Sequence, residues 1–410
     1  MELNFEQQEI YKLQKDTLVN GLIDIVPLES FEKKLKESIL NNKPLKIKFG
    51  LDPTAPDVHL GHTVVINKLK QFQDFGHQIQ IIIGDFTGKI GDPSDRDATR
   101  KQLTDEEVIY NAKTYFDQIS KIIDKENIEV FYNSKWLKQL DLEEILNIAS
   151  SITLTRLLER KDFTNRFNNN KPIALHEFFY PLMQGYDSVA LECDIEIGGT
   201  DQLFNLLMGR HMQGHYKQNE QVVLTLPLLE GLDGIQKMSK SKNNYVGIDE
   251  SPKDMYGKLM SYPDDLMEKY INLVTHYSIE NKKALIENIK QNKIHPKNAK
   301  MQIAKHIVTL YHGDKKAEIA EQEFNNVFGR NALPEQIEEL ELNAGIYNTY
   351  EFLTDNLSLF SSKSEARRMI SNGGVKINGE KLDETQLKIK LEDEMIVQVG
   401  KRKFKKIILK

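Results

Sequence analysis

Residues 45–62 read LKIKFGLDPTAPDVHLGH, and this stretch decides the fold class. Apolar residues alternate with lysine and glycine in its first part, a period of two that predicts a half-buried strand. The turn DPTAPD follows, and apolar residues at helical spacing then predict a helix from about Gly61 to Asp74. Gly76 comes just after, where glycine commonly ends a helix. The stretch is therefore a strand–turn–helix unit.

Strand and helix patterns continue to alternate up to about residue 250. Apolar strands are predicted in QIQIIIG, IEVFYN, CDIEIGG and VVLTLP, at residues 78–84, 128–133, 193–199 and 222–227. Alternating βα order with apolar strands is typical of a parallel sheet covered by helices on both faces. The fold class is therefore α/β, with a Rossmann-type parallel-sheet domain over residues 1–250. Ligands are expected at the carboxyl ends of its strands.

The rest of the chain predicts two further domains. Residues 251–330 have a wholly helical pattern, and residues 331–348 read as an acidic, proline-containing linker. Residues 349–410 combine a helical segment, SKSEARRMISNG, with short strand patterns, which predicts a small α+β module. Two or three domains are also what 410 residues suggest, because a single core rarely grows so large.

Composition indicates an ordinary globular protein of a reducing compartment. Hydrophobic residues make up 40% and charged residues 28% of the chain. The amino-terminal MELNFEQQEIYKLQKD is acidic and amphipathic, unlike a secretory signal, and no run of about 18 uncharged apolar residues predicts a membrane span. The single cysteine, Cys193, has no partner for a disulfide or a zinc site. We therefore expect a cytoplasmic protein.

Positive charge is concentrated at the carboxyl end. The chain has a formal net charge of -6, but residues 361–410 hold 13 Lys+Arg and 7 Asp+Glu, a net of +6, which leaves -12 for the rest. The last ten residues, KRKFKKIILK, hold most of the excess. This run is either a solvated basic tail or, since apolar residues alternate with its lysines, a terminal strand with one basic face.

HLGH is a candidate phosphate-binding motif. His59 and His62 lie in the first turn of the predicted helix, where backbone amides and the helix dipole favour an anion. Gly61 between them lets a ligand approach the backbone closely. Taken alone, the motif is a weak signal, and two surface histidines or a pair of metal ligands would be the more common explanation, although HEXXH spacing is absent.

KMSKS, at residues 237–241, is a second candidate. Lys237 and Lys240 lie on the loop after the VVLTLP strand and could clamp a triphosphate. A single K-x-x-K is more often a basic surface loop, but both motifs leave strands of one sheet, so a nucleotide could lie between them. Neither a Walker loop nor a dinucleotide fingerprint competes, because GDFTGKI has the wrong spacing and has Ile90 where Ser or Thr is required.

YPLMQGYD, at residues 180–187, carries a polar triad. Tyr180, Gln184 and Asp187 fall at positions i, i+4 and i+7, on one face of a helix. Such a face is commonly the solvated side of a surface helix. From spacing alone, that ordinary interpretation is preferred.

HLGH and KMSKS resemble the two signature motifs of class I aminoacyl-tRNA synthetases. The match to the tyrosyl-tRNA synthetases is essentially end to end from about Phe31, and it includes GLDPTAPDVHLGH, GDPS (91–94), YPLMQGYD, GGTDQ (198–202) and KMSKS in that family's order. The resemblance implies activation of L-tyrosine by ATP to tyrosyl-adenylate, followed by transfer to the 3′ end of tRNA(Tyr).

The resemblance also implies roles for particular residues. The α-amino group of tyrosine would be held by Asp92, Tyr180 and Gln184, its phenol by Asp187 and its carboxylate by Gln202. A buried carboxylate that awaits a hydroxyl discriminates against phenylalanine, a property for which this enzyme family is already a known example. His59, His62, Lys237 and Lys240 would be catalytic. ATP would be bound by these four together with Gly50, Asp52, Gly61, Arg96, Arg100, Gly199 and Asp201, with Mg²⁺ assisting and no dedicated metal ligands on the protein.

Other parts of the chain match further parts of the family. Lys48 stands where many bacterial members have a tyrosine that also contacts the phenol, so the chain resembles a second bacterial subgroup with KMSKS in full. Residues of about 104–166 resemble the dimer-forming insertion, which implies a homodimer, and residues 251–330 resemble the anticodon-binding region. SSKSEARRMISNGGVKINGEKL is similar to a small RNA-binding module of a ribosomal protein and pseudouridine synthases, from which Arg367 and Arg368 would contact tRNA phosphates.

Two alternatives stay open at this stage. A tryptophanyl-tRNA synthetase shares the fold and the chemistry, although Asp187 and the carboxyl-terminal module argue against it. An RNA-binding scaffold with a decayed catalytic site belongs to another class, and the intact HLGH, GDPS, GGTDQ and KMSKS argue against that. Pyrophosphate exchange with different amino acids separates all three.

Overall fold

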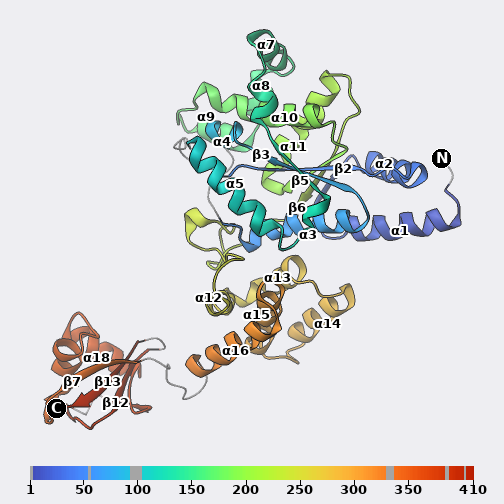
Figure 1. Cartoon of the computed structure of the whole chain (residues 1–410). Coiled ribbons are helices and arrows are strands. Elements are labelled where there is room, and N and C mark those ends of the chain that lie inside the picture. Colours follow the sequence, from blue (N-terminus) through green and yellow to red (C-terminus); the bar gives the residue numbers. More distant parts are fainter. Residues whose placement is uncertain (1–2, 54–56, 93–103, 329–336, 384–386, 401–402) are drawn as a thin grey trace. The chain divides into compact units, whose positions relative to one another are not determined.

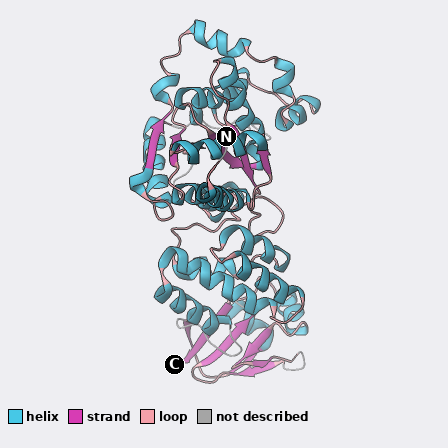
Figure 2. Ribbon diagram, turned by 90° about the vertical axis from the view of Figure 1, so that its right-hand side faces the viewer, coloured by secondary structure: helices cyan, strands magenta, loops and turns pink. Residues whose placement is uncertain are grey.

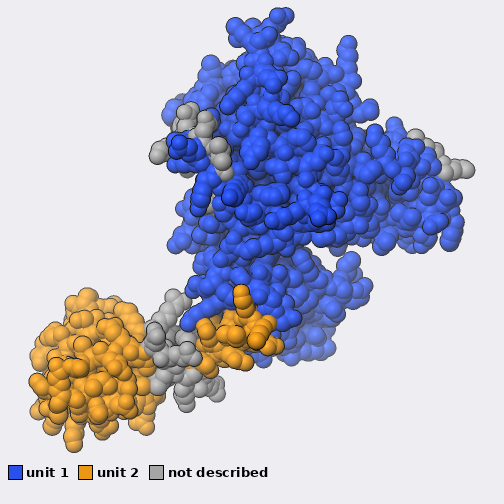
Figure 3. All heavy atoms as spheres, viewed as in Figure 1, with its two compact units in different colours: residues 1–314 blue, residues 315–410 orange. Residues whose placement is uncertain are grey.

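The structure is a computed structural model that describes residues 3–53, 57–92, 104–328, 337–383, 387–400 and 403–410. The chain divides into two compact units, residues 1–314 and residues 315–410 (Figure 3). Each unit has its own sheet.

The first unit is built on a six-stranded sheet with the strand order β1-β6-β5-β2-β3-β4. Its strands are β1 (Asp24–Val26), β2 (Lys46–Leu51), β3 (Gln78–Ile83), β4 (Ile128–Tyr132), β5 (Ile195–Gly199) and β6 (Val222–Leu226). All neighbours are parallel except β1, which pairs with β6 in the antiparallel direction. The predicted parallel α/β sheet is therefore confirmed, and β1 adds an edge strand that the sequence patterns did not predict.

Helices cover both faces of this sheet (Figures 1 and 2). α3 (Leu60–Asp74) packs against β3 and α1 (Phe5–Val19), whereas α10 (Phe179–Leu191) packs against α11 (Leu203–His215), which contacts β5 and β6. The other helices of this region are α2 (Leu28–Asn41), α4 (Thr87–Ile90), α5 (Asp105–Ile119), α6 (Ser134–Leu137), α7 (Leu142–Ser150), α8 (Leu154–Leu158) and α9 (Lys161–Asn168). Because both faces are covered, β6 is buried along its whole length.

The strand order creates a crevice at the carboxyl edge of the sheet. The chain runs outward from β2 through β3 to β4, and then returns to β5 on the other side of β2. At this reversal the loops that leave β2 and β5 diverge, which is where α/β sheets bind ligands. The loops that carry HLGH, GGTDQ and KMSKS all leave this edge, because they follow β2, β5 and β6.

The predicted helical segment 251–330 forms five helices in the described part of the chain. They are α12 (Pro252–Leu259), α13 (Met267–Val274), α14 (Ile279–Lys290), α15 (Pro296–His312) and α16 (Asp314–Phe328). α12 to α15 belong to the same compact unit as the sheet, since α13 packs against α3 and the Tyr270 hydroxyl donates to the Glu230 carbonyl oxygen at 3.0 Å. The boundary expected at residue 250 therefore does not separate compact units, and the division falls after Asp314 instead.

The second unit contains the predicted α+β module. A five-stranded sheet has the order β10-β9-β12-β13-β7, and β8 pairs with β11. The elements are β7 (Glu338–Leu342), β8 (Ile346–Asn348), α17 (Thr349–Glu351), α18 (Lys363–Ser371), β9 (Val375–Ile377), β10 (Glu380–Lys381), β11 (Lys388–Lys390), β12 (Met395–Val399) and β13 (Lys403–Leu409). The basic carboxyl-terminal run is thus a strand and not a free tail.

The linker predicted over residues 331–348 is wrong in its second half, because β7 and β8 lie there. β7 pairs in parallel with β13, and Leu340 and Leu342 pack against the buried core of this unit. The signal that was missed is the alternation of glutamate and leucine in EELEL, a period of two.

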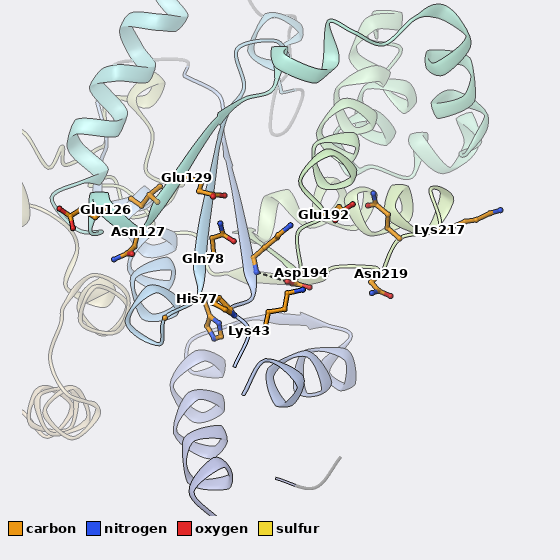
Figure 4. Close-up of a pocket in the computed structure, with 15 residues that line it drawn as sticks. Lys43, His77, Gln78, Glu126, Asn127, Glu129, Glu192, Asp194, Lys217 and Asn219 are labelled. Carbon is orange, nitrogen blue, oxygen red and sulfur yellow. Dashed lines mark hydrogen bonds between the residues drawn. The ribbon is translucent and has the colours of Figure 1, made fainter. Parts of the chain in front are cut away.

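A cavity of about 870 Å³ lies at the opposite, amino edge of the first sheet (Figure 4). It is lined by residues that precede or begin the parallel strands, among them Lys43, His77, Glu126, Asp194 and Lys217. None of the sequence motifs contributes to its lining. Within the described ranges, no helix combines the length and the apolar character needed to cross a membrane.

Candidate active site

The end of β2 and the start of α10 meet at Asp52. Its carboxylate accepts hydrogen bonds from the Thr87 hydroxyl at 2.9 Å and from the Tyr180 hydroxyl at 2.8 Å. Gly50, just before it, is exposed, and no atom lies within 4 Å of the position that a Cβ would occupy there. Asp52, which was predicted to bind ATP, therefore contacts Tyr180, which was predicted to bind tyrosine, so the two predicted subsites are adjacent.

HLGH forms a compact histidine pair at the start of α3. His59 is the N-cap residue, and its ring stacks on that of His62 with 3.7 Å between ring centroids. The His59 backbone N–H donates to His62 Nδ1 at 3.2 Å, so the ring proton of neutral His62 is on Nε2. His59 Nδ1 is buried and has no hydrogen-bond partner in the described part of the chain. Both rings thus retain a polar atom for a ligand.

The two histidines are held neutral. Burial lowers the pKa of His62 to about 4, and the positive charges of Lys240 and Lys237 lower it further. Burial, with His62 and Lys240 next in importance, also holds the pKa of His59 well below its usual value. At neutral pH these residues can therefore donate hydrogen bonds but carry no positive charge.

A titration of histidine ring resonances by NMR tests this. Because the pKa of His62 is depressed, its ring should stay neutral from pH 8 down to about pH 5 and become protonated only near pH 4. Histidines that titrate normally in the same spectrum provide the reference. A midpoint near 6.5 for His62 would contradict the buried geometry.

KMSKS lies against HLGH. The segment that follows KMSKS is bonded to the HLGH region: the Leu60 N–H donates to the Val246 carbonyl oxygen and the Ile248 N–H to the Val58 carbonyl oxygen, both at 3.0 Å. A Cβ added at Gly61 would lie 3.5 Å from Cβ of Met238, which is van der Waals contact with KMSKS, and 3.0 Å from the His59 ring, which it would crowd. The structure therefore brings the two motifs together.

Each lysine of KMSKS is paired with a carboxylate. Lys237 Nζ lies 2.9 Å from Asp201 Oδ2, and Lys240 Nζ lies 3.1 Å from Asp57 Oδ2. A Cβ at Gly199 would come within 2.5 Å of Asp201 Oδ1, which explains the glycine at this position. These half-exposed pairs mark a place where phosphate oxygens could compete for the lysines.

The polar triad of α10 is not a solvated face. Asp187 is only 3% exposed, and it accepts from Trp136 Nε1 at 2.8 Å and from Asn133 Nδ2 at 3.2 Å. Burial raises the pKa of Asp187 to about 7, while the charge of Lys48 and these two hydrogen bonds oppose the rise. Tyr180 is buried as well, and burial with the nearby charge of Asp52 raises the pKa of its phenol. Sequence spacing alone had favoured the wrong interpretation of this face.

Asp92 is held from two sides. Arg160 Nη2 donates to Asp92 Oδ1 at 3.1 Å, and Gln202 Nε2 donates to Asp92 Oδ2 at 2.9 Å. Arg160 is itself buried and bonded to Asn205 Oδ1 at 2.9 Å. Asp92 is thus bonded both to Gln202 of GGTDQ and to Arg160, which belongs to none of the motifs.

Some site residues were missed from the sequence, and others lie outside the description. Thr87, Asn133, Trp136 and Arg160 belong to none of the motifs, and their roles depend on partners far away in the chain.

The predicted ATP contacts Arg96 and Arg100 lie outside the described residues. Arg367 and Arg368 belong to the second unit, on α18, where both are exposed. Among described residues, no group of three or more His, Cys, Asp or Glu is arranged to hold a metal ion.

Two family models match the chain. One, for class I tRNA synthetases of the tryptophan and tyrosine type, matches residues 40–329, and one for the carboxyl-terminal domain of tyrosine–tRNA ligases matches residues 330–407. A tyrosine–tRNA ligase of Moorella thermoacetica is 50% identical over 401 residues, covering 98% of this chain and 97% of the relative. One from Carboxydothermus hydrogenoformans is 49% identical, covering 97% of this chain and 98% of the relative.

Solved structures share the fold. A C-terminally truncated mitochondrial tyrosyl-tRNA synthetase of Aspergillus nidulans superposes with a TM-score of 0.64 at 23% identity, covering 78% of this chain and 97% of that one. A tyrosyl-tRNA synthetase of Archaeoglobus fulgidus, complexed with L-tyrosine, gives a TM-score of 0.60 at 21% identity, covering 76% of this chain and 99% of that one.

The fold, the paired HLGH and KMSKS motifs and the first family model define a class I aminoacyl-tRNA synthetase. Within that class the chain belongs to the bacterial tyrosine–tRNA ligase family, as its carboxyl-terminal domain and its full-length relatives show. The tryptophanyl alternative is thereby set aside.

Proposed function

We propose that this chain activates L-tyrosine with ATP to give tyrosyl-adenylate and passes the tyrosyl group to the 3′ end of tRNA(Tyr). The observation that carries the proposal is the closeness of HLGH and KMSKS at the strand-order reversal, in a domain that also has a helix with a buried carboxylate, Asp187. Family membership fits this reaction.

Tyrosine would be bound by the cluster around α10. Asp187 would accept the phenol hydroxyl, which requires the substrate to displace or share the bonds from Trp136 and Asn133. Asp92, Tyr180 and Gln184 would hold the α-ammonium group. In support of this, Asp92 lies close enough to Tyr180 for its charge to raise the pKa of the Tyr180 phenol. Gln202 would hold the tyrosine carboxylate.

ATP would lie between HLGH and KMSKS. The tyrosine carboxylate attacks the α-phosphate in line, and pyrophosphate leaves, so that catalysis consists of positioning and of stabilising charge on the phosphates. The neutral rings of His59 and His62 donate hydrogen bonds there, while Lys237 and Lys240 leave their carboxylate partners for the departing pyrophosphate. The remaining contacts would come from Gly50, Asp52, Gly61, Gly199 and Asp201, with Arg96 and Arg100 from the segment outside the described residues. Mg²⁺ would be bound chiefly through the ATP phosphates and would neutralise their charge.

We propose further that the chain is a cytoplasmic homodimer that binds tRNA through residues 251–330 and 349–410. Large apolar side chains are exposed within the expected dimer-forming insertion, residues 104–166: Tyr110, Leu142, Leu146 and Leu154. Exposed apolar clusters commonly mark protein interfaces. Sedimentation equilibrium decides the oligomeric state.

ATP–pyrophosphate exchange tests the whole assignment. Exchange should depend on L-tyrosine, because its phenol hydroxyl can donate a hydrogen bond to the buried Asp187 carboxylate. Phenylalanine, which has the same ring without the hydroxyl, and tryptophan serve as controls. Exchange supported by tryptophan in preference to tyrosine would refute the proposal.

Asp187→Ala should lower kcat/KM for tyrosine, because a charge-assisted hydrogen bond to the phenol is lost. The loss should correspond to about 2–4 kcal/mol of transition-state binding free energy. Discrimination against phenylalanine should fall with it. Asp187→Asn, which keeps the shape and one acceptor oxygen, is the matched control and should lose less. Full activity and selectivity in Asp187→Ala would place the residue outside the pocket.

A further inference from the structure

Lys48 lies on β2, and its ammonium group is held inside the protein. The side chain is fully buried, and Nζ lies 3.0 Å from Glu196 Oε1. Lys48 and Glu196 are register partners on the neighbouring strands β2 and β5, so the ion pair bridges the strands on either side of the reversal. It therefore lies beneath the tyrosine site.

Lys48 also anchors the helix that carries the substrate-binding triad. Its Nζ donates to the Gln184 carbonyl oxygen at 3.0 Å and to Ser188 Oγ at 2.7 Å. These two residues of α10 stand on either side of Asp187 in the sequence. The helix turn that presents Asp187 is thus fixed to β2 by one ammonium group.

Glu196 determines which way the Gln184 amide points. Its carboxylate accepts from Gln184 Nε2 at 3.3 Å, and also from Ser188 Oγ at 3.2 Å and Gln221 Nε2 at 2.5 Å. Because the Gln184 amide nitrogen donates to Glu196, the amide oxygen points away from Glu196. An oxygen is the atom that an α-ammonium group requires, whereas an amide nitrogen would repel it.

We propose that Lys48 and Glu196 are positioning residues for tyrosine: Glu196 orients the Gln184 amide as an acceptor for the α-ammonium group, and Lys48 fixes the turn that carries Gln184 and Asp187. This inference rests on the roles proposed above for Gln184 and Asp187. Stability alone is a poor explanation, because an apolar pair of similar volume commonly serves a fold as well as a buried ion pair.

The same pair acts on the charge of Asp187. The groups that face this carboxylate are Lys48 from β2, Glu196 from β5, and Asn133 and Trp136 from the α6 region. The positive charge of Lys48 opposes the rise in the Asp187 pKa that burial causes. Without Lys48 the pKa should rise, so the acidic limb of the pH profile of kcat/KM for tyrosine should move to higher pH.

The test uses the double variant Lys48→Met/Glu196→Met, which replaces both charges without leaving one buried alone. Pyrophosphate exchange should show KM for tyrosine raised by about tenfold or more, with KM for ATP changed by less than about twofold, because only the tyrosine contacts are misaligned. The melting temperature is measured in parallel. Lys48→Met alone adds the pH profile, provided that it folds.

Two comparisons separate positioning from general loosening. In a Gln184→Ala background the double substitution should raise KM for tyrosine by a smaller factor than in the parent enzyme, since the amide to be oriented is already gone and only the anchoring of Asp187 is still lost. The matched control is Arg166→Met/Glu177→Met, another buried ion pair of the same unit, which should leave KM for tyrosine unchanged.

The inference is overturned by an unchanged KM for tyrosine in Lys48→Met/Glu196→Met, by full additivity with Gln184→Ala, or by an equal rise in the Arg166/Glu177 control. Gln184→Ala itself distinguishes a failure of the positioning inference from a failure of the role proposed for Gln184. If it raises KM for tyrosine while the double variant does not, only the positioning inference fails. If it leaves KM unchanged, the proposed role of Gln184 fails as well.

Discussion

Lys240→Ala is expected to slow tyrosyl-adenylate formation by about a hundredfold or more while tyrosine binding hardly changes. Lys240 Nζ lies 3.1 Å from Asp57 Oδ2 and close enough to His62 to lower the pKa of that ring. It contacts none of the residues assigned to tyrosine in the described part of the chain. Its charge is therefore available to the leaving pyrophosphate, where negative charge develops, and not to the amino acid in its ground state.

Pre-steady-state measurement of adenylate formation over a range of tyrosine concentrations separates rate from binding. The matched control is Lys242→Ala, two residues away in the same loop, where the lysine is exposed. That variant should behave like the parent enzyme. A large rise in the dissociation constant for tyrosine with an unchanged rate would show that Lys240 has a different role.

Removal of residues 329–410, which include the sheet of the second unit, should separate the two half-reactions. A chain that ends at Phe328 keeps every motif needed for tyrosyl-adenylate and should catalyse pyrophosphate exchange at close to the full rate. Charging of tRNA should be severely impaired, because the phosphate contacts of the carboxyl-terminal module are lost. The cut falls before β7, since that strand belongs to the sheet being removed. The Aspergillus nidulans relative was itself crystallised in a C-terminally truncated form.

The charges of the module decide where tRNA should bind. The lysines of β13 face the glutamates of β7: Lys405 pairs with Glu338, Lys406 with Glu339 at 3.6 Å, and Lys410 with Glu341 at 2.8 Å. Residues 338–410 hold 13 Lys+Arg against 12 Asp+Glu, a net of +1 and not the +6 counted from residue 361. The carboxyl-terminal strand is therefore a poor candidate for the tRNA surface.

Arg367 and Arg368 are better placed. Both are exposed on α18, and neither makes an ion pair within the described residues, although Arg367 lies over the Tyr350 ring at 5.8 Å. Arg367→Ala/Arg368→Ala should weaken tRNA binding and reduce its dependence on salt. Lys405→Ala/Lys406→Ala is the matched control and should have the smaller effect. The experiment measures exchange, charging and tRNA affinity at two salt concentrations, and undiminished charging by the truncated chain would show that the module is not the tRNA anchor.

The sequence by itself determined what depends on local spacing. Period-two and helical patterns placed β2, β3, β5, β6 and α3, and their alternating order predicted a parallel sheet with its ligands at the carboxyl edge. HLGH and KMSKS stood out because their chemistry lies within a few consecutive residues. Resemblance to a family then attached roles to Tyr180, Gln184 and Asp187, against an interpretation from spacing that favoured solvent.

Only the tertiary structure decided which distant residues meet. Lys48 and Glu196 are separated by the whole path from β2 to β5. Arg160, which pairs with Asp92, lies in the segment 104–166 that was predicted to form the dimer. β7 was mistaken for linker because its partner, β13, lies at the other end of the module. The Lys48–Glu196 and Arg160–Asp92 pairs leave no periodic signal, because their energy comes from burial and from a partner brought close by folding, and neither is a property of neighbouring residues.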